Sequence, residues 1–244
     1  MGWPSGYGRR VLAEVDSTNA EAARLAPGLV GPEWILGLRQ TAARGRRGRG
    51  WVMPAGNFAA TLVVRLDEPP DRVALRSFVA ALALYDGLEA VTGTAAGLAL
   101  KWPNDVLMNH GKVAGILLEG LGQGALAVGI GVNLVAAPEA AEVESGAVLP
   151  VSVLAETGVR VTPEALLEAL AVAWASHEER LVTYGFGPIR EAWLARAARL
   201  GEEITARTGR ETLTGTFETV DEAGRLVLKT PKGRVAIAAA DVFF

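Results

Sequence analysis

The stretch from Leu98 to Gly120, LALKWPNDVLMNHGKVAGILLEG, constrains the fold more than any other part of the chain. It contains short apolar runs that are separated by two turn signals. Pro103 favours an extended conformation at the residue before it, and the Asn-Asp pair that follows favours a turn. The second signal is Asn-His-Gly, in which we expect Gly111 to take the positive φ of a hairpin loop. The pattern predicts strand, turn, strand, tight turn and strand.

Other segments are expected to form strands around this block. They are residues 34–40, 56–66 and 125–135, which are short and rich in apolar or β-branched side chains. The last of them contains Gly129 and Gly131. A glycine inside a strand often marks a place where another group approaches closely.

Helices are predicted on both sides of these strands. Residues 15–26 read as a strand end that feeds a helix, at whose start Thr18 and Glu21 fit a capping box. Apolar side chains recur at helical spacing over residues 71–91, which predicts one amphipathic helix packed on a sheet. Two further helices are expected, from Pro163 to about Val182 and over residues 189–198.

After Leu200 the helical spacing ends. Short runs rich in Thr, Val and Ile alternate with Thr-Gly, Ala-Gly and Lys-Gly turns, which is typical of a small barrel. We therefore predict an α+β fold with two domains. Residues 1–198 would form a mixed β-sheet with packed helices, and residues 199–244 a small β-barrel.

Composition narrows the range of functions. The chain has 244 residues, no cysteine and two histidines, so cysteine nucleophiles, cysteine-bound zinc and histidine-rich metal clusters are excluded. No signal peptide or long apolar run is present. We expect a cytoplasmic enzyme or binding domain that does not enter membranes.

The loop RQTAARGRRGRGW, Arg39 to Trp51, holds four arginines and three glycines between Arg44 and Gly50. Glycines let backbone amides curl around an anion, and arginines neutralise the anion with planar donors. Nucleic-acid sites usually have a longer basic tract and a basic surface. Because the net charge is −3 and the pI is about 5.6, a small phosphorylated ligand fits better. From these residues alone, a solvated connecting turn is the other interpretation.

Lysine and asparagine are rare enough to be informative. The chain has only four lysines against twenty arginines, and Lys101 and Lys112 flank the WPND turn and the NHG hairpin. Lys112 opens an apolar strand, so we expect its ammonium to point into a partly dry site, where it would attract a carboxylate or phosphate. Asn133 lies in a predicted strand, where asparagine is unfavourable unless it has a hydrogen-bonding task or marks a bulge.

Four ordered blocks together resemble the biotin protein ligases, in the short form without an N-terminal DNA-binding domain. The blocks are DSTN (16–19), QTAARGRRGRGW (40–51), KWPNDVLMNHGKVAGILLE (101–119) and GIGVNL (129–134). The resemblance covers the first two-thirds of the chain, and the predicted C-terminal barrel is similar to the family's SH3-like domain. In this family biotin and ATP give biotinyl-5′-AMP, and the biotinyl group then passes to a lysine of a biotin carboxyl carrier domain.

The resemblance also implies roles for residues. Biotin would be bound by Ser17, Thr18, Asn19, Gln40, Arg44, Gly45, Arg46, Lys112 and Gly115. The adenylate would be bound by Trp51, Asn104, Asp105, Lys112 and Asn133. Lys112, Arg46 and Lys101 would serve the chemistry, and Mg²⁺ would accompany ATP without an identified protein ligand. A homodimer through a sheet edge is a further implication, and no DNA binding is expected because DSTN begins at residue 16.

Two alternatives and one departure accompany this assignment. The nearest alternative is a lipoate or octanoate protein ligase, which has a similar fold. The other is a non-catalytic protein that binds anions or nucleic acid through the Arg/Gly loop; a ligand-binding-only homologue is disfavoured by Lys112. Ala43 stands where the family loop commonly has glycine, which could stiffen the loop.

Overall fold

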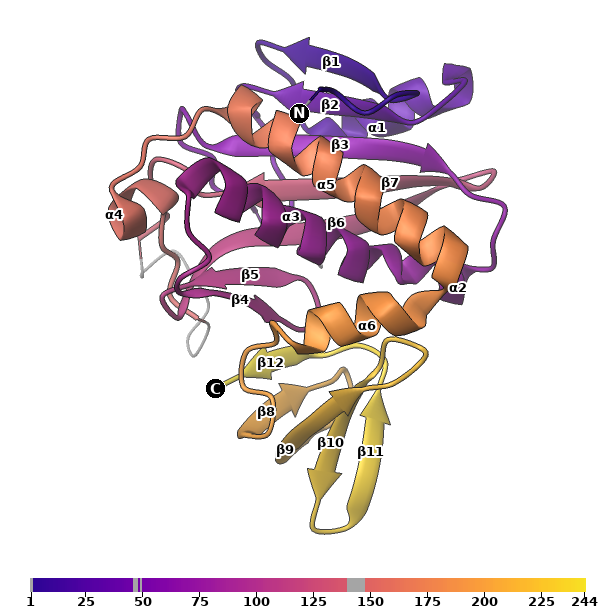
Figure 1. Ribbon diagram of the computed structural model, residues 1–244, viewed down its shortest axis with the longest axis vertical. Helices are drawn as coiled ribbons and strands as arrows, with labels where there is room; N and C mark the ends of the chain where they lie inside the picture. The colour runs from indigo at the N-terminus through magenta and orange to yellow at the C-terminus, as the bar shows by residue number, and fades with distance from the viewer. Residues whose placement is uncertain (1, 46–47, 49, 140–147) are drawn as a thin grey trace.

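A seven-stranded mixed sheet forms the centre of the molecule, with strand order β1-β2-β3-β7-β6-β5-β4 (Figure 1). The computed structural model describes residues 2–45, 48, 50–139 and 148–244. β1 is parallel to β2, and the other neighbouring pairs are antiparallel. The strands are β1 Gly8–Leu12, β2 Glu33–Gly37, β3 Phe58–Arg65, β4 Leu98–Lys101, β5 Asp105–Met108, β6 Gly111–Gly122 and β7 Ala125–Val132.

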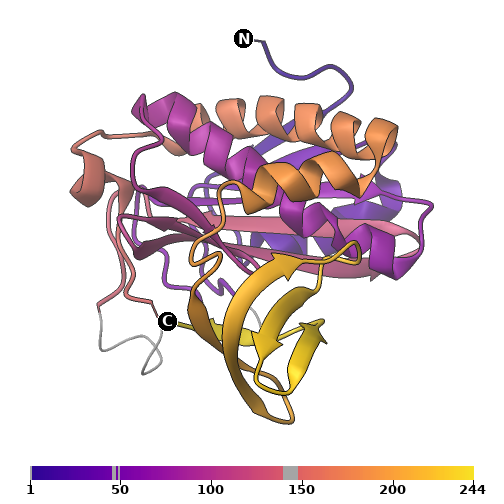
Figure 2. The ribbon, with the colours of Figure 1, turned by 60° about the horizontal axis from the view of Figure 1, so that its bottom comes forward.

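Helices cover the two faces of this sheet unequally. The long helices α3 and α5 cross one face side by side, and α1 packs on the other (Figures 1 and 2). The helices are α1 Thr18–Leu25, the 3-10 turn η1 Ala26–Gly28, α2 Pro70–Ala74, α3 Arg76–Thr92, α4 Val153–Thr157, α5 Pro163–Tyr184 and α6 Phe186–Leu194. None of the helices in the described residues has the length and apolar character needed to cross a membrane.

The sequence of β7, ALAVGIGV, explains why the two faces differ. Successive strand side chains point to opposite faces. Leu126, Val128, Ile130 and Val132 therefore join the main core beneath α3 and α5. Ala125 and Ala127 instead face α1, and Gly129 and Gly131 continue the same row. Along β7, the face opposite the long helices is thus built from small residues, which leaves room above it for other groups.

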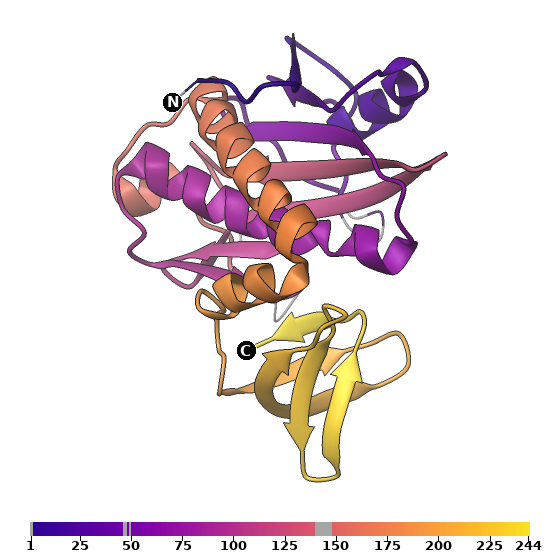
Figure 3. The same cartoon turned by 45° about the vertical axis from the view of Figure 1, so that its right-hand side comes forward.

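The C-terminal residues form a separate five-stranded antiparallel sheet with order β11-β10-β9-β8-β12 (Figure 3). Its strands are β8 Glu203–Arg207, β9 Thr212–Val220, β10 Leu226–Thr230, β11 Gly233–Ile237 and β12 Asp241–Phe243. It contacts the larger part of the molecule through the Trp102 indole, whose Nε1 donates to Gly224 O at 3.1 Å. The α+β class and the two sheets are confirmed; closure of the small sheet into an SH3-like barrel stays a prediction.

The strands predicted within residues 98–120 are confirmed, but the role given to Gly111 was wrong. Asn109 and His110 carry the positive φ values, 47° and 69°, and Gly111 is the first residue of β6. A Cβ on Gly111 would lie 2.2 Å from Val151 Cγ1. Glycine is required there because another segment packs against the strand.

Two predicted helices have different limits in the structure. The helix expected over residues 71–91 is divided at Leu75, because Leu75 N donates to Arg72 O and Phe78 N donates to Leu75 O, the three-residue spacing of a tighter turn. The helix expected over residues 189–198 is α6, which begins and ends earlier. Residues 196–198 instead run beside β4, where Leu100 N donates to Arg196 O and Ala198 N donates to Leu100 O, both at 2.8 Å. β1 and α4 had not been predicted.

Arg76 is a buried charge within the helical layer, with 1% of its surface exposed. Its guanidinium donates to Glu68 through two hydrogen bonds of 2.7 Å and to Glu178 at 2.8 and 3.1 Å. The hydrogen bonds from Arg76 hold the pKa of the Glu68 carboxyl below its ordinary value of 4.5. This network ties α5 to the segment before α2.

Acid should therefore weaken this network. A carboxyl whose folded-state pKa is lowered stabilises the fold fully above its unfolded pKa, and this stabilisation is lost as pH falls through the folded value. Below about pH 4.5 the melting temperature should fall more steeply in the wild-type protein than in Glu68→Gln, which has no carboxyl to protonate. If the melting temperatures of the two proteins fell in parallel from pH 7 to pH 3, the Glu68 carboxylate would not contribute this pH-dependent stability. Glu202→Gln, which changes an exposed glutamate directly before β8, is the control.

Candidate functional site

A cavity of about 450 Å³ lies over the small-residue face of the sheet. Every described residue that the sequence assigned to the site lines this cavity. These residues are Ser17, Thr18, Asn19, Gln40, Arg44, Gly45, Trp51, Lys101, Asn104, Asp105, Lys112, Gly115 and Asn133. Arg46 lies outside the described residues. The segments that carry these residues come from both ends of the sheet order, so only folding brings them together.

One end of the cavity is uncharged and polar. Thr18 N donates to Gln40 Oε1 at 2.8 Å, and Thr18 Oγ1 donates to the same oxygen at 3.2 Å. The predicted capping box was wrong, because Ser17 is the N-cap and Thr18 is the first helical residue. The Thr18 hydroxyl faces Gln40 and Thr61 rather than a helix amide. Thr61, the one polar side chain in the interior of the apolar strand β3, had not been assigned to the site.

Asn19 sits directly above β7 at this end. A Cβ on Gly129 would lie 2.2 Å from Asn19 Oδ1, so the absence of a side chain at this position admits the amide. Thr61 Oγ1 donates to Asn19 Oδ1 at 2.6 Å, and Asn19 Nδ2 donates to Glu119 Oε2 at 2.5 Å. The amide is therefore held from two strands. In the sheet register Thr61 and Gly129 are direct neighbours.

The other end of the cavity carries charge. Asp105 lies between two lysines: its Oδ1 is 2.7 Å from Lys112 Nζ, and its Oδ2 is 3.8 Å from Lys101 Nζ. The β4–β5 hairpin places Lys101 opposite Asp105, and β6 brings Lys112 beside them. The Lys101 side chain is 8% exposed and that of Lys112 is 29% exposed, so Lys101 lies in the drier position. The two lysine ammonium groups carry more positive charge than the Asp105 carboxylate neutralises. This excess of positive charge favours an anionic ligand.

An aromatic wall lies next to these charges. The Trp51 ring covers Gly131, where a Cβ would be 2.8 Å from Cε2, and Gly115, where it would be 3.4 Å from Cζ3. Lys112 Nζ is 5.8 Å from the ring centroid. Gly131 and Gly115 are paired across β7 and β6, so the ring lies on backbone alone.

Two buried polar atoms near this wall have unused hydrogen-bonding capacity. Trp51 Nε1 and Asn133 Oδ1 find no hydrogen-bond partner among the described residues. Asn133 Nδ2 donates to Val151 O at 3.1 Å. This hydrogen bond orients the side-chain amide and leaves Oδ1 without a partner among the described residues. Asn133 directly follows β7 rather than lying within it. A buried donor and a buried acceptor without partners are the pattern expected where a ligand supplies them.

The polar and charged ends lie along the same strands. Thr61 and Gly129 form one row across the sheet, and Ala59, Gly131, Gly115 and Asp105 form the next. These rows are two residues apart, which is about 7 Å in a strand. A ligand of moderate length can therefore touch both ends at once.

The Arg/Gly loop begins and ends at the cavity. Arg44 and Gly50 form an antiparallel bridge, and Trp51 N donates to Ala43 O at 3.1 Å. Of its described residues, Gln40, Arg44, Gly45, Gly50 and Trp51 line the cavity. The described parts of the loop thus form part of the cavity wall.

The C-terminal sheet completes one wall, which the sequence had not indicated. Asp241, Val242 and Phe243 of β12 line the cavity. Next to them the Phe244 ring lies 5.5 Å from Lys101 Nζ and 5.2 Å from the Arg199 guanidinium. No local motif marks these residues, since their position depends on the packing of two sheets.

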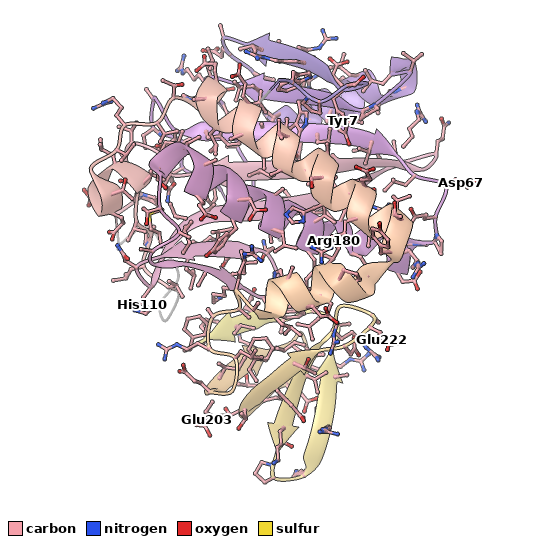
Figure 4. The ribbon with its side chains drawn as sticks, viewed as in Figure 1. Tyr7, Asp67, His110, Arg180, Glu203 and Glu222 are labelled. Carbon is pink, nitrogen blue, oxygen red and sulfur yellow. The ribbon has the colours of Figure 1, made fainter. Side chains whose placement is uncertain are left out.

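The histidines lie elsewhere. His177 Nε2 is 2.6 Å from Asp86 Oδ2 between α5 and α3. His110, labelled in Figure 4, lies at the periphery on the β5–β6 turn. The described residues contain no group of three or more His, Cys, Asp or Glu side chains arranged to hold a metal ion.

Comparisons with known proteins agree with this geometry. The model of the biotin/lipoate A/B protein ligase family matches residues 11–134, and the model of the biotin protein ligase C-terminal domain matches residues 200–244. The chain is 61% identical to a biotin–[acetyl-CoA-carboxylase] ligase of Paracoccus denitrificans, over 96% of this chain and 99% of that protein. It is 32% identical to the ligase of the same name from Mycobacterium tuberculosis, over 95% and 87%.

A solved structure has the same architecture. The biotin protein ligase from Aquifex aeolicus in complex with biotin and ATP superposes with a TM-score of 0.84 and 25% sequence identity, over 96% of this chain and 97% of that one. The sequence blocks that suggested the family are also the segments that line the cavity. The chain therefore belongs to the biotin/lipoate A/B protein ligase family, among its biotin protein ligases.

Proposed function

We propose that this chain activates biotin with ATP to biotinyl-5′-AMP and transfers the biotinyl group to a lysine of a biotin carboxyl carrier domain. The observation that carries the proposal is the cavity itself, which joins an uncharged hydrogen-bonding end to a cationic end. A ligand with a polar head and a carboxylate fits this arrangement. The 61% identical relative carries the corresponding name.

In the first step the biotin carboxylate oxygen attacks the α-phosphorus of ATP, the bond to the β-phosphate breaks, and pyrophosphate leaves. Two anions must approach each other, so their repulsion has to be offset. Lys112 and Lys101 are placed to do this, and Arg44 adds a third cation on the cavity wall. In the second step a carrier lysine amine attacks the acyl carbon and AMP leaves. Neither step uses a nucleophile from the enzyme.

The polar end would bind the head of biotin through Ser17, Thr18, Asn19 and Gln40. Gly115 in β6 and Gly45 in the loop, which also line the cavity, would belong to the biotin side. On the other side, the unpaired Trp51 Nε1 and Asn133 Oδ1 would serve the adenylate, together with Asn104 and Asp105. We propose that the Arg/Gly loop, with Arg46, closes over the mixed anhydride, because exclusion of water protects such an intermediate.

ATP is expected to bring Mg²⁺ into this site. Magnesium keeps several waters and usually takes only one or two protein carboxylates beside the phosphates. Asp105 and Asp241 both line the cavity, so the donor set fits. The ion would screen phosphate charge when bound. Asp105 would then give up part of its contact with the two lysines in order to hold the ion.

Further proposals concern the domain limits, the pairing of copies, DNA binding and location in the cell. We propose residues 1–198 as the catalytic domain and 199–244 as an appended domain that contributes β12 to the cavity wall. Pairing of two copies through a sheet edge, absence of DNA binding and a cytoplasmic location are further predictions. The net charge of −3 supports the second of these.

The transfer step can be tested directly. Purified protein, ATP, Mg²⁺ and biotin should label a biotin carrier domain, and a carrier whose acceptor lysine is changed to arginine should stay unlabelled. Labelling of a lipoyl domain with lipoate, and none of the biotin carrier, would move the chain to the lipoate side of its family.

A further inference from the structure

Glu119 is a charged residue that contacts the site without lining the cavity. It lies on β6 opposite Ala127, on the face that carries α1. Its Oε2 accepts a hydrogen bond from Asn19 Nδ2 at 2.5 Å, and Asn19 is only 7% exposed. A glutamate at the end of an apolar strand would by itself suggest only a solvated strand terminus. Its contact with a buried cavity residue gives it a more specific role.

The contact fixes the direction of the hydrogen bonds at this end of the cavity. A carboxylate only accepts hydrogen bonds, so Asn19 must turn its NH₂ group toward Glu119 and its Oδ1 toward Thr61. Thr61 has one hydroxyl hydrogen, and it is used on Asn19 Oδ1 at 2.6 Å. Asn19 cannot reverse without losing both interactions.

The same counting determines what Thr18 offers. Its oxygen lies 2.8 Å from Thr61 Oγ1 and 3.2 Å from Gln40 Oε1. Gln40 Oε1 can only accept, and the Thr61 hydrogen is already used. The Thr18 hydrogen therefore goes to Gln40 Oε1 and not into the cavity. Thr18 and Asn19 both present oxygen lone pairs to a ligand.

We infer that Glu119 is a positioning residue that sets this acceptor polarity, and that the polarity selects the N–H groups of the biotin ring. The inference rests on the proposed function for the identity of the ligand. Glu119 does not touch the ligand and acts through Asn19. A charged acceptor holds the amide more strongly than a neutral one, because charge-assisted hydrogen bonds are about twice as strong.

Glu119→Gln tests the inference with little change in shape. The new amide can turn either its oxygen or its nitrogen toward Asn19, so the orientation of Asn19 is no longer enforced. KM for biotin should rise about 10-fold, the ratio expected between a charged and a neutral hydrogen bond, with KM for ATP within about 2-fold of wild type. Glu156→Gln is the matched control, because Glu156 accepts from Asn109 Nδ2 at 2.8 Å outside the cavity.

A rescue experiment separates positioning from a general structural effect. Asn19→Asp places two carboxylates together and should raise KM for biotin strongly. In Asn19→Asp/Glu119→Gln the new glutamine can donate to the new aspartate, whose other oxygen still accepts from Thr61. KM for biotin should be at least about 10-fold lower in the double variant than in Asn19→Asp. Additive effects, or a Glu119→Gln variant that changes KM for ATP as much as KM for biotin, would overturn the inference.

Failure of the proposed function and failure of the Asn19–Glu119 coupling give different results. A wild-type protein with no biotin-dependent activity would overturn the proposed function and the naming of biotin. Melting temperatures of the same variants without ligand would still report the coupling between Asn19 and Glu119. Additive shifts in those temperatures would overturn the coupling itself.

Discussion

Lys112→Met should reduce biotin-dependent ATP–pyrophosphate exchange by at least about 100-fold. Lys112 Nζ lies 2.7 Å from Asp105 Oδ1, at the charged end of the cavity. Methionine keeps the length and most of the apolar contact of the side chain but removes its charge. The Asp105 carboxylate would then face two anionic substrates with Lys101 as the remaining lysine, and the repulsion between biotin and ATP would be offset less.

The effect should appear mainly in kcat/KM for exchange, and the melting temperature should change little because Lys112 is partly exposed. Lys232→Met, in the β10–β11 turn of the C-terminal sheet, is the matched control and should exchange at the wild-type rate. If Lys112→Met exchanged within about 10-fold of the wild-type rate, Lys112 would not be needed to offset the repulsion between biotin and ATP.

Gly129→Ala should raise KM for biotin by about 100-fold. The added Cβ would lie 2.2 Å from Asn19 Oδ1, well inside any normal contact. Asn19 can move only by giving up its bonds to Thr61 and Glu119, at 2.6 and 2.5 Å. Each such bond contributes about 1–2 kcal/mol, and about 1.4 kcal/mol corresponds to a factor of ten in affinity.

Gly120→Ala is the matched control for this substitution. Gly120 lies in the neighbouring strand β6, and a Cβ there meets nothing within 4 Å. It should leave KM for biotin and KM for ATP unchanged. If Gly129→Ala bound biotin as tightly as Gly120→Ala, the polar end of the cavity would not be where biotin binds.

Much of the fold follows from local patterns in the sequence. The strands and turns of residues 98–120 were predicted because proline, asparagine and glycine determine backbone conformation locally. The alternation of large and small residues in β7 is equally local, and it explains why one face of the sheet is open. By contrast, the early end of α6 depends on residues 196–198 pairing with the β4 edge, a contact that helical spacing cannot reveal.

Some residues of the site could be predicted from the sequence and others could not. Most of the residues named from the four blocks have polar or charged side chains, whose chemistry is visible in the sequence. Thr61, Glu119 and β12 were missed because each acquires its role from a partner distant in sequence, as Glu119 does from Asn19, 100 positions away. Thr61 could have been suspected as the one polar residue between apolar neighbours in its strand.

We propose that one cavity couples biotin to ATP, and ATP–pyrophosphate exchange measures that coupling directly. Purified protein would be supplied with ATP, Mg²⁺ and labelled pyrophosphate, with biotin, lipoate or octanoate added separately. Exchange that depends on biotin and is absent with the other two acids is the predicted result. Exchange with lipoate or octanoate alone, or with none of the three acids, would show that the cavity does not couple biotin to ATP.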